Sequence, residues 1–357
     1  MIKFRVLAIN PGSTSTKIAV FDDETLVFEE TIRHSKNDLA IYDSILQQSK
    51  MRHDLVVETL SKNGITFDTI TVIVGRGGLL RPLDSGAYRV NDAMIRDLIS
   101  DAAIVHASAL GGITARELGD EYGIPAYVVD PIVVDEMEPR AKLTGIPGVE
   151  RRSVFHALNT KAIARRAAAA LGLEYENARF VVAHMGGGIT VGAHWYGRVV
   201  DVNDGVAGEG PFTPERSGAV PLMGIIDMCF SGEYTKEEMK KLITGAGGMS
   251  AYLGTNNLLD VEAMIRTGDE YAALVVDSMA YQVVKEIGAM IAVLEGRVDA
   301  IILTGGMAYS NRFTGVIKQH TDQMARVMVF PGEDEMRALA EGVIRVLEGK
   351  ELEKVYK

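Results

Sequence analysis

The sequence predicts an α/β protein built from two related lobes, each a mixed sheet flanked by helices. With 357 residues the chain is too long for one ordinary hydrophobic core. The pattern RVLAINPGSTSTKIAVFDDETLVFE at 5–29 recurs as RFVVAHMGGGITVGAHWYGRVVDVN at 179–203. Each copy reads as three short apolar strands joined by turns. After each copy, helical and strand patterns alternate, which is typical of α/β folds.

The first turn in each copy consists of small residues, at 11–15 and at 186–188. Glycine tolerates positive φ and has no Cβ, so the backbone N–H groups of such turns can approach an anion closely. Two phosphate-binding turns half a chain apart predict a duplicated domain, with a nucleotide held in a cleft between the two lobes.

In the first half, the pattern predicts one or two helices over 38–64, a buried strand over 69–78 and helices over 91–100 and 106–122. A short strand over 126–130 ends in Asp130, and a carboxylate at a strand end often belongs to a site at the sheet edge. Segment 139–152 is rich in proline and glycine, so we place the lobes at 1–150 and 151–332. The C-terminal helix, within 333–357, is expected to pack back on the first lobe.

In the second half, we expect a helix from 153 to 172, the second three-strand unit, and a helix beginning with the capping-box pair Thr235 and Glu238. A long helix over 269–295 is apolar on more than one face, so either a core or a subunit interface covers it. Strands over 299–303 and 327–330 and a closing helix over 333–347 complete the pattern.

Composition narrows the possible partners. The net charge of −11, without a basic block, argues against nucleic acids and anionic membranes. Cys229 is the only cysteine, which excludes an internal disulfide or CxxC metal site and predicts a core thiol. No signal peptide or membrane-length apolar run is present, so we expect a cytoplasmic protein.

Several motifs suit phosphate chemistry. NPGSTSTK, from Asn10 to Lys17, surrounds a turn with an amide, hydroxyls and a cation, although a decorated Pro-Gly hairpin is the alternative. His184 enters three consecutive glycines, and Gly305 and Gly306 follow a buried strand. Arg76 and Arg216 lie in Gly/Pro-rich loops, and guanidinium groups bind carboxylate and phosphoryl oxygens in pairs. Surface arginines and a structural histidine are the competing interpretations.

As a set, these segments resemble the acetate and butyrate kinase family of the acetokinase–sugar kinase–heat-shock–actin superfamily. The resemblance spans almost the whole chain, through NPGSTSTK, GRGGLL, HASALG, VVDPIVVDEMEP, RRSVFHALNTK, VVAHMGGGI, GPFTPERSG and LTGGMA in order. NPGSTST in place of NAGSSS, and HMGGG in place of HLGNG, are similar to the butyrate and branched-chain fatty acid kinase branch.

The resemblance implies two actin-like (ribonuclease H-like) lobes and assigns roles to individual residues. The implied catalytic residues are Asn10, Arg76, Asp130, His184 and Arg216. Histidines expected to line the substrate cleft are His106 and His156, and Phe155 beside them is a candidate wall of the acyl pocket. Expected nucleotide contacts are Ser13, Ser15, Lys17, Gly186, Gly187, Gly188, Gly305 and Gly306. Glu335 is expected to assist Mg²⁺. Gly187 replaces a family asparagine, so any contact of that side chain is absent or made by the backbone.

The implied reaction converts ATP and a short-chain carboxylate, butyrate by preference, into ADP and an acyl phosphate, with Mg²⁺ as cofactor. Isobutyrate, propionate and acetate are alternative substrates. A sugar kinase, or an actin- or chaperone-like ATP switch, are the rival functions. The resemblance also implies a homodimer or higher homo-oligomer.

Overall fold

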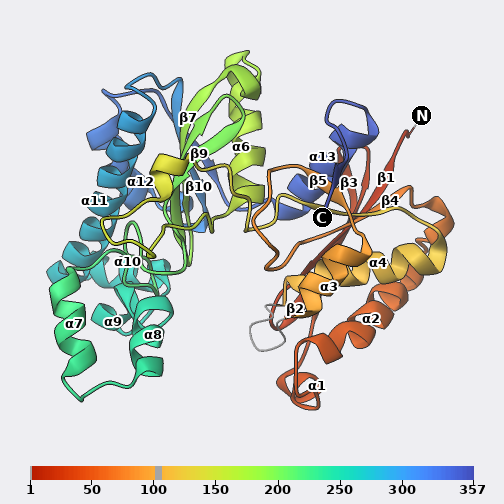
Figure 1. The fold of residues 1–357 in the computed structure, drawn as a ribbon, viewed down its shortest axis with the longest axis horizontal. Coiled ribbons are helices and arrows are strands. Elements are labelled where there is room, and N and C mark those ends of the chain that lie inside the picture. The colour runs from red at the N-terminus through yellow and green to blue at the C-terminus, as the bar shows by residue number, and fades with distance from the viewer. Residues whose placement is uncertain (1, 101–106) are drawn as a thin grey trace. The chain divides into compact units, whose positions relative to one another are not determined.

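The computed structural model describes residues 2–100 and 107–357, which form two compact units. The first unit contains the described residues up to Val134 together with Asp334–Lys357, and the second contains Asp135–Glu333. The sequence placed the lobe boundary at 150, whereas the structure groups residues 135–150 with the second unit. Each unit contains one mixed sheet with helices on its faces (Figure 1).

The first unit has a seven-stranded sheet in the order β12-β5-β6-β4-β1-β2-β3. Its strands are β1 (Arg5–Pro11), β2 (Ser15–Asp22), β3 (Thr25–Arg33), β4 (Val72–Gly75), β5 (Ala87–Arg89), β6 (Ala126–Val129) and β12 (Lys354–Val355). Its helices are α1 (Lys36–Ala40), α2 (Ser49–Lys62), α3 (Asp92–Ser100), α4 (Ala109–Tyr122) and α13 (Glu335–Leu347), with short 3₁₀ turns at Leu46–Gln48 and Phe67–Thr69.

The second unit has a five-stranded sheet in the order β11-β10-β7-β8-β9. Its strands are β7 (Arg179–Met185), β8 (Ile189–Trp195), β9 (Arg198–Val202), β10 (Ala300–Gly305) and β11 (Val327–Pro331). Its helices are α5 (Pro139–Lys142), α6 (Ala157–Leu171), α7 (Leu222–Phe230), α8 (Lys236–Thr244), α9 (Gly248–Leu253), α10 (Leu258–Arg266), α11 (Glu270–Val293) and α12 (Asn311–Thr321), with 3₁₀ turns at Tyr175–Asn177 and Gly306–Tyr309.

The two sheets repeat one arrangement, which confirms the predicted duplication. In the first unit, β1 pairs antiparallel with β2 and parallel with β4, and in the second β7 pairs antiparallel with β8 and parallel with β10. Even the irregularity between the second and third strands recurs, between Val20 and Phe21 and between Ala193 and His194. The turns after β1 and β7 therefore occupy equivalent positions.

Alternation along the strands assigns each face of a sheet to a different set of helices. On β7, Val181 and Ala183 pack toward α11 and α12, whereas Phe180 and Val182 pack toward α6. Figure 1 shows α11 and α12 on one side of this sheet and α6 on the other. This two-sided burial explains why the strand is apolar without alternation from Phe180 to Ala183.

In the first unit, α2, α3 and α4 share one hydrophobic core with β1, β4 and β6. The helix α13 packs on the opposite face, where Gly342 leaves room for the Val129 side chain. A Cβ at Gly342 would overlap Val129, so this glycine permits the close approach of helix and sheet.

Several predicted elements differ in detail. The helical region at 38–64 is divided, because α1 ends at Ala40 and α2 begins only at Ser49. The helix predicted from 153 begins at Ala157, because residues 153–156 form no regular element and the Val154 carbonyl accepts from Gly205 N–H. The capping box of Thr235 and Glu238 is confirmed.

Two surface features bear on expectations from composition. Cys229 is exposed on α7, so the prediction of a core thiol is wrong. Of the helices in the described residues, none combines the length and apolarity that a membrane span requires.

Candidate active site

The turn after β7 is built around an arginine that occupies the space beside a glycine. Gly186 N–H donates to the Gly188 carbonyl at 3.0 Å, which closes the turn. A Cβ on Gly188 would overlap the Arg216 guanidinium and touch His156. Only glycine at this position therefore lets the guanidinium lie against the turn.

The loop of GPFTPERSG holds Arg216 in place through Thr213. The Thr213 hydroxyl donates to the Gly187 carbonyl at 2.8 Å and accepts from the Arg216 N–H at 3.0 Å. Gly248 fits against the same loop backbone, with φ of 63° and no room for a Cβ. These contacts connect the loop to the turn as one rigid piece.

The Arg216 side chain is partly buried and retains an unused donor. Its Nη1 donates to the Gly205 carbonyl at 2.5 Å, while its buried Nε has no hydrogen-bond partner among the described residues. Burial lowers the pKa of Arg216, and the charges of Glu215 and Asp204 oppose that shift. Arginine remains protonated at neutral pH, so the turn faces a fixed positive charge.

Two histidines stack beside this arginine. The rings of His156 and His184 lie 3.7 Å apart between centroids and within 8° of parallel. His184 is 1% exposed, and its Nδ1 lies 2.9 Å from Asn159 Nδ2. His156 Nδ1 contacts the Thr190 hydroxyl at 3.0 Å. Both rings are therefore oriented by polar neighbours on α6 and β8.

The second ring nitrogen of His184 lies close to a carboxylate. His184 Nε2 lies 3.0 Å from Glu333 Oε1, yet it lacks a partner with hydrogen-bond geometry among the described residues. The short distance therefore marks electrostatic proximity and not a directed hydrogen bond. A buried, poorly satisfied nitrogen is able to bond to an oxygen of a ligand.

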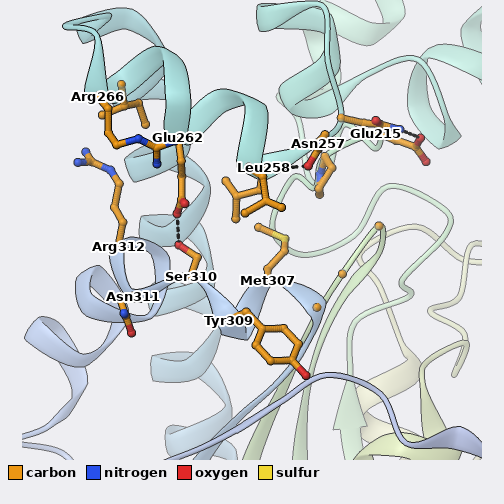
Figure 2. A pocket seen from close by; sticks show the side chains of 17 residues that line it. Glu215, Asn257, Leu258, Glu262, Arg266, Met307, Tyr309, Ser310, Asn311 and Arg312 are labelled. Carbon is orange, nitrogen blue, oxygen red and sulfur yellow. Dashed lines mark hydrogen bonds between the residues drawn. The ribbon is translucent and has the colours of Figure 1, made fainter.

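A cavity of about 790 Å³ adjoins the same turn (Figure 2). Gly186, Gly187 and Gly306 contribute backbone to its wall, and Leu258 and Met307 contribute apolar surface. Its other lining residues are Pro214, Glu215, Asn256, Asn257, Leu259, Glu262, Ile265, Arg266, Tyr309, Ser310, Asn311 and Arg312. Figure 2 shows Glu262 bonded to the Ser310 hydroxyl at the wall of the cavity. The volume and the mixed lining are typical of a small-molecule site.

Glycine is suited to positions 305 and 306 for different reasons. Gly305 has φ of 90°, and a Cβ there would overlap the Met185 backbone. Gly306 has open space beside it and lines the cavity. Only Gly306 of the pair leaves its surface available to a ligand in the cavity.

In the first unit, α13 brings a carboxylate to two predicted site residues. Asn10 Nδ2 donates to Glu335 Oε2 at 2.6 Å, and Arg76 pairs with Glu335 Oε1. Asn10 lies at the end of β1, and Arg76 follows β4, its N–H bonded to the Ile9 carbonyl. The sequence named all three residues, and the structure brings them together within one unit.

Asp130 lies at the end of β6 in a strained backbone conformation. Its φ is 40°, which non-glycine residues rarely adopt. Its Oδ1 accepts from the Ser85 hydroxyl and from Gly86 N–H, both at 2.7 Å. Strain held by such bonds occurs often at functional positions.

The predicted phosphate-contacting residues around the turn after β1 differ in exposure and in the contacts that they already make. Lys17 pairs with Glu29 on β3 at 2.9 Å, so its ammonium group is already engaged along the sheet. Ser13 is exposed and Ser15 half-buried. Beneath the turn lies Arg52, which was not predicted from the sequence.

For the remaining predicted residues, the structure gives their position or burial but few contacts. His106 lies outside the described residues. Phe155 is buried at 3% exposure, next to His156 in the chain. Among residues 2–100 and 107–357, no group of three or more His, Cys, Asp or Glu side chains is placed to hold a metal ion.

Four parts of the site were not predicted from the sequence, namely Thr213, Asn159, Arg52 and the α10 side of the cavity. Asn257 caps α10 by accepting from Leu259 N–H, and an asparagine before an apolar run is a recognisable helix start. Arg52 is spaced i, i+4, i+8 with Val56 and Leu60, which places it on the buried face of α2. Thr213 and Asn159 act through tertiary contacts for which the sequence carries no local signal.

Known structures share this architecture. Acetate kinase from Porphyromonas gingivalis aligns with a TM-score of 0.79 and 19% identity over 96% of this chain and 100% of that one. Acetate kinase from Entamoeba histolytica aligns with a TM-score of 0.76 and 16% identity over 95% and 98%. A propionate kinase from Francisella tularensis subsp. tularensis SCHU S4 gives 0.75 and 17% over 95% and 98%.

At these identities the likeness establishes the fold, and it confirms the predicted α/β class with actin-like lobes. The family assignment comes from the sequence itself. The model of the Acetokinase family matches residues 139–330, more than half of the chain. The chain therefore belongs to the acetokinase family of carboxylate kinases.

Proposed function

We propose that this carboxylate kinase phosphorylates a short-chain fatty acid, with butyrate preferred, at the expense of ATP. The observation that carries the proposal is the turn of the second unit. There Gly188, Arg216 and His184 combine a bare backbone, a partly buried cation and a buried ring nitrogen that lies 3.0 Å from the Glu333 carboxylate without a hydrogen bond among the described residues. Such a set suits the oxygens of a phosphoryl group in transfer.

The adjoining cavity supports ATP as the phosphoryl donor. Its glycine-lined end meets the turn, and its apolar part suits the base and ribose. We expect Gly186, Gly187 and Gly306 to contact the nucleotide through backbone. We assign Gly305 a structural role: without a Cβ it lets the end of β10 pack closely against the Met185 backbone at the start of the turn.

In the proposed reaction, a carboxylate oxygen forms a bond to the γ-phosphorus while the bond from that phosphorus to the β-phosphate oxygen breaks. The electron pair leaves with ADP, and no proton is transferred. A fatty acid is already ionised at pH 7, so no general base is required. The residues need only to position two anions and stabilise the charge that develops on the phosphoryl group.

We assign roles to the residues accordingly. Arg216 and His184 contact phosphoryl oxygens, and Arg76 and Asn10 orient the reacting anions. Asp130 helps position substrate, and His156 supports the His184 ring. The Glu335 carboxylate now pairs with Asn10 and Arg76, so it is able to fix both groups. Ser13, Ser15 and Lys17 remain proposed phosphate contacts, Lys17 only after it leaves Glu29.

Magnesium is consistent with this donor set. Mg²⁺ is usually bound through one or two carboxylates together with substrate phosphates and water. Glu335 supplies one such carboxylate, and the ion would neutralise charge on the nucleotide.

Self-association is part of the proposal. The face of α11 that includes Val276 and Val283 is buried in the core, whereas Tyr271, Leu274 and Tyr281 on the same helix are exposed. In the same unit, α7 exposes Leu222, Met223, Ile226 and Phe230. Large apolar side chains exposed on a helix are candidates for burial against a partner, so we propose a homo-oligomer that uses these helices.

Acyl-group kinetics test the proposal. The full-length chain is supplied with MgATP and straight or branched acids of two to six carbons, and hydroxylamine traps any acyl phosphate. We expect the highest kcat/KM for butyrate, since each methylene changes discrimination by about 1–3 kcal/mol. Absence of hydroxamate with every acid would refute the proposal. Phosphorylation of hexoses would favour a sugar kinase, and ATP turnover indifferent to acids would favour a switch.

A further inference from the structure

The turn after β1 rests on a completely buried arginine. Arg52, on α2, is 0% exposed. Its Nη1 donates to the carbonyls of Gly12 and Ser15, each at 2.9 Å, and its Nη2 lies 3.4 Å from the Ser13 carbonyl. One guanidinium therefore contacts three carbonyls of a single turn.

The remaining contacts of Arg52 are uncharged. Gln48 Oε1 accepts from Nη2 at 2.9 Å, and the Thr16 hydroxyl lies 3.1 Å from Nη1. Within the described part of the chain, no carboxylate forms an ion pair with Arg52. Burial lowers its pKa, yet an arginine keeps its proton at neutral pH. A buried charge without a counter-ion is costly, so its presence under this turn calls for a compensating role.

The contacts of Arg52 determine where the turn's amide groups point. In a planar trans peptide, the C=O of one residue and the N–H of the next point in opposite directions. Because the carbonyls of Gly12 and Ser13 face Arg52, the N–H groups of Ser13 and Thr14 face away from it. Both residues are exposed, and neither N–H donates to an acceptor among the described residues.

We propose that Arg52 is a positioning residue that holds this turn in an anion-binding form. It draws the carbonyls inward, so that the Ser13 and Thr14 amides are directed outward, and its own charge adds to the positive potential there. Adjacent free amides of this kind bind anions. The anion is a phosphoryl group of the nucleotide, and in this respect the inference rests on the proposed function.

Amide resonances test the geometry directly. In full-length protein labelled with ¹⁵N at serine and threonine, the Ser13 and Thr14 amide signals should shift and saturate as ATP is added. Adenosine, which lacks phosphates, should leave both signals in place. Wild-type signals that do not respond to ATP would overturn the proposal, whatever any variant does.

Variants separate positioning from support of the fold. In Arg52→Met, we expect ATP affinity to fall about 10- to 100-fold, a range typical when a supporting residue is lost, while adenosine affinity is unchanged. Arg52→Lys, which keeps the charge but not the fork of donors, should recover part of the loss. Lys62→Met removes an exposed cation from the same helix and should behave as wild type. Equal weakening of ATP and adenosine would mean a structural role and would refute the proposal.

Two further results keep the experiment decisive. If Arg52→Met fails to fold, Arg52→Lys and the wild-type titration still decide the matter. If no acid yields acyl phosphate, the proposed function fails, whereas the ATP titration of Ser13 and Thr14 still supports or refutes the role of Arg52.

Discussion

The two units use one hairpin scaffold but support its turn in different ways. After β1, Arg52 lies beneath the turn and donates hydrogen bonds to its carbonyls, while hydroxyl-bearing residues form the surface. After β7, three glycines form the turn and Arg216 lies directly against it, in the space that a Cβ at Gly188 would fill. One arginine acts from behind the backbone, and the other presents its guanidinium beside it.

This difference indicates a division of work. A guanidinium bonded on every side to carbonyls and an amide oxygen has no donor to spare, so Arg52 is suited to fix a shape. Arg216 keeps a buried Nε without a partner among the described residues, so it is suited to contact a ligand. We therefore propose that the same residue type positions the turn in one unit and binds ligand in the other, and three predictions can break or sharpen that contrast.

The largest effect is expected from Arg216→Ala. Loss of a guanidinium that stabilises phosphoryl transfer should lower kcat by about 10³-fold, with the fold retained. Initial rates of hydroxamate formation and urea unfolding check both parts. Arg326→Ala, at an exposed position of the same unit, is the control. Near-normal turnover in Arg216→Ala would show that this arginine is not part of the chemistry.

The next effect is expected from Gly188→Ala. The added methyl group would displace the Arg216 guanidinium from the turn, and a shift of about 1 Å at a reacting group can cost about 10²-fold in rate. The kcat of this variant should fall while binding of adenosine in the cavity persists. Gly315→Ala on α12 adds a methyl group into open space and serves as the control. An active Gly188→Ala enzyme would mean that Arg216 does not need its observed place.

These residues also show what the sequence can predict. Repetition of apolar runs and turns was enough to predict both hairpins, since strand alternation and turn chemistry are local properties. The sequence motif predicts a functional loop around Arg216, but the link of this loop to Gly187 through Thr213 joins residues 26 positions apart in the chain and has no local signal. Arg52 was overlooked because a charged residue in a helix is normally exposed.

The smallest effect compares the pH dependence of stability in the two units. Burial is the main cause that lowers the pKa of both His34 and His194, helped by Arg52 for the first and by Lys161 and Arg165 for the second. A histidine in the unfolded chain takes up a proton near pH 6.5, whereas in the folded protein these two histidines take up a proton only at lower pH. The free energy of unfolding should therefore fall as pH drops below about 6.5, by at most about 1.4 kcal/mol per pH unit for each histidine.

We expect the second unit to show the steeper loss, because His194 is completely buried and its pKa lies well below the ordinary value. Trp195, the only tryptophan in the chain, is on β8 next to His194, so its fluorescence reports on that unit during urea unfolding. His194→Gln should reduce the acid dependence seen by fluorescence, and His34→Gln should leave it unchanged. His320→Gln, at an exposed site on α12, is the matched control. If His34→Gln flattens the fluorescence profile as much as His194→Gln, the two units do not respond to acid separately, and the contrast between them fails at this point.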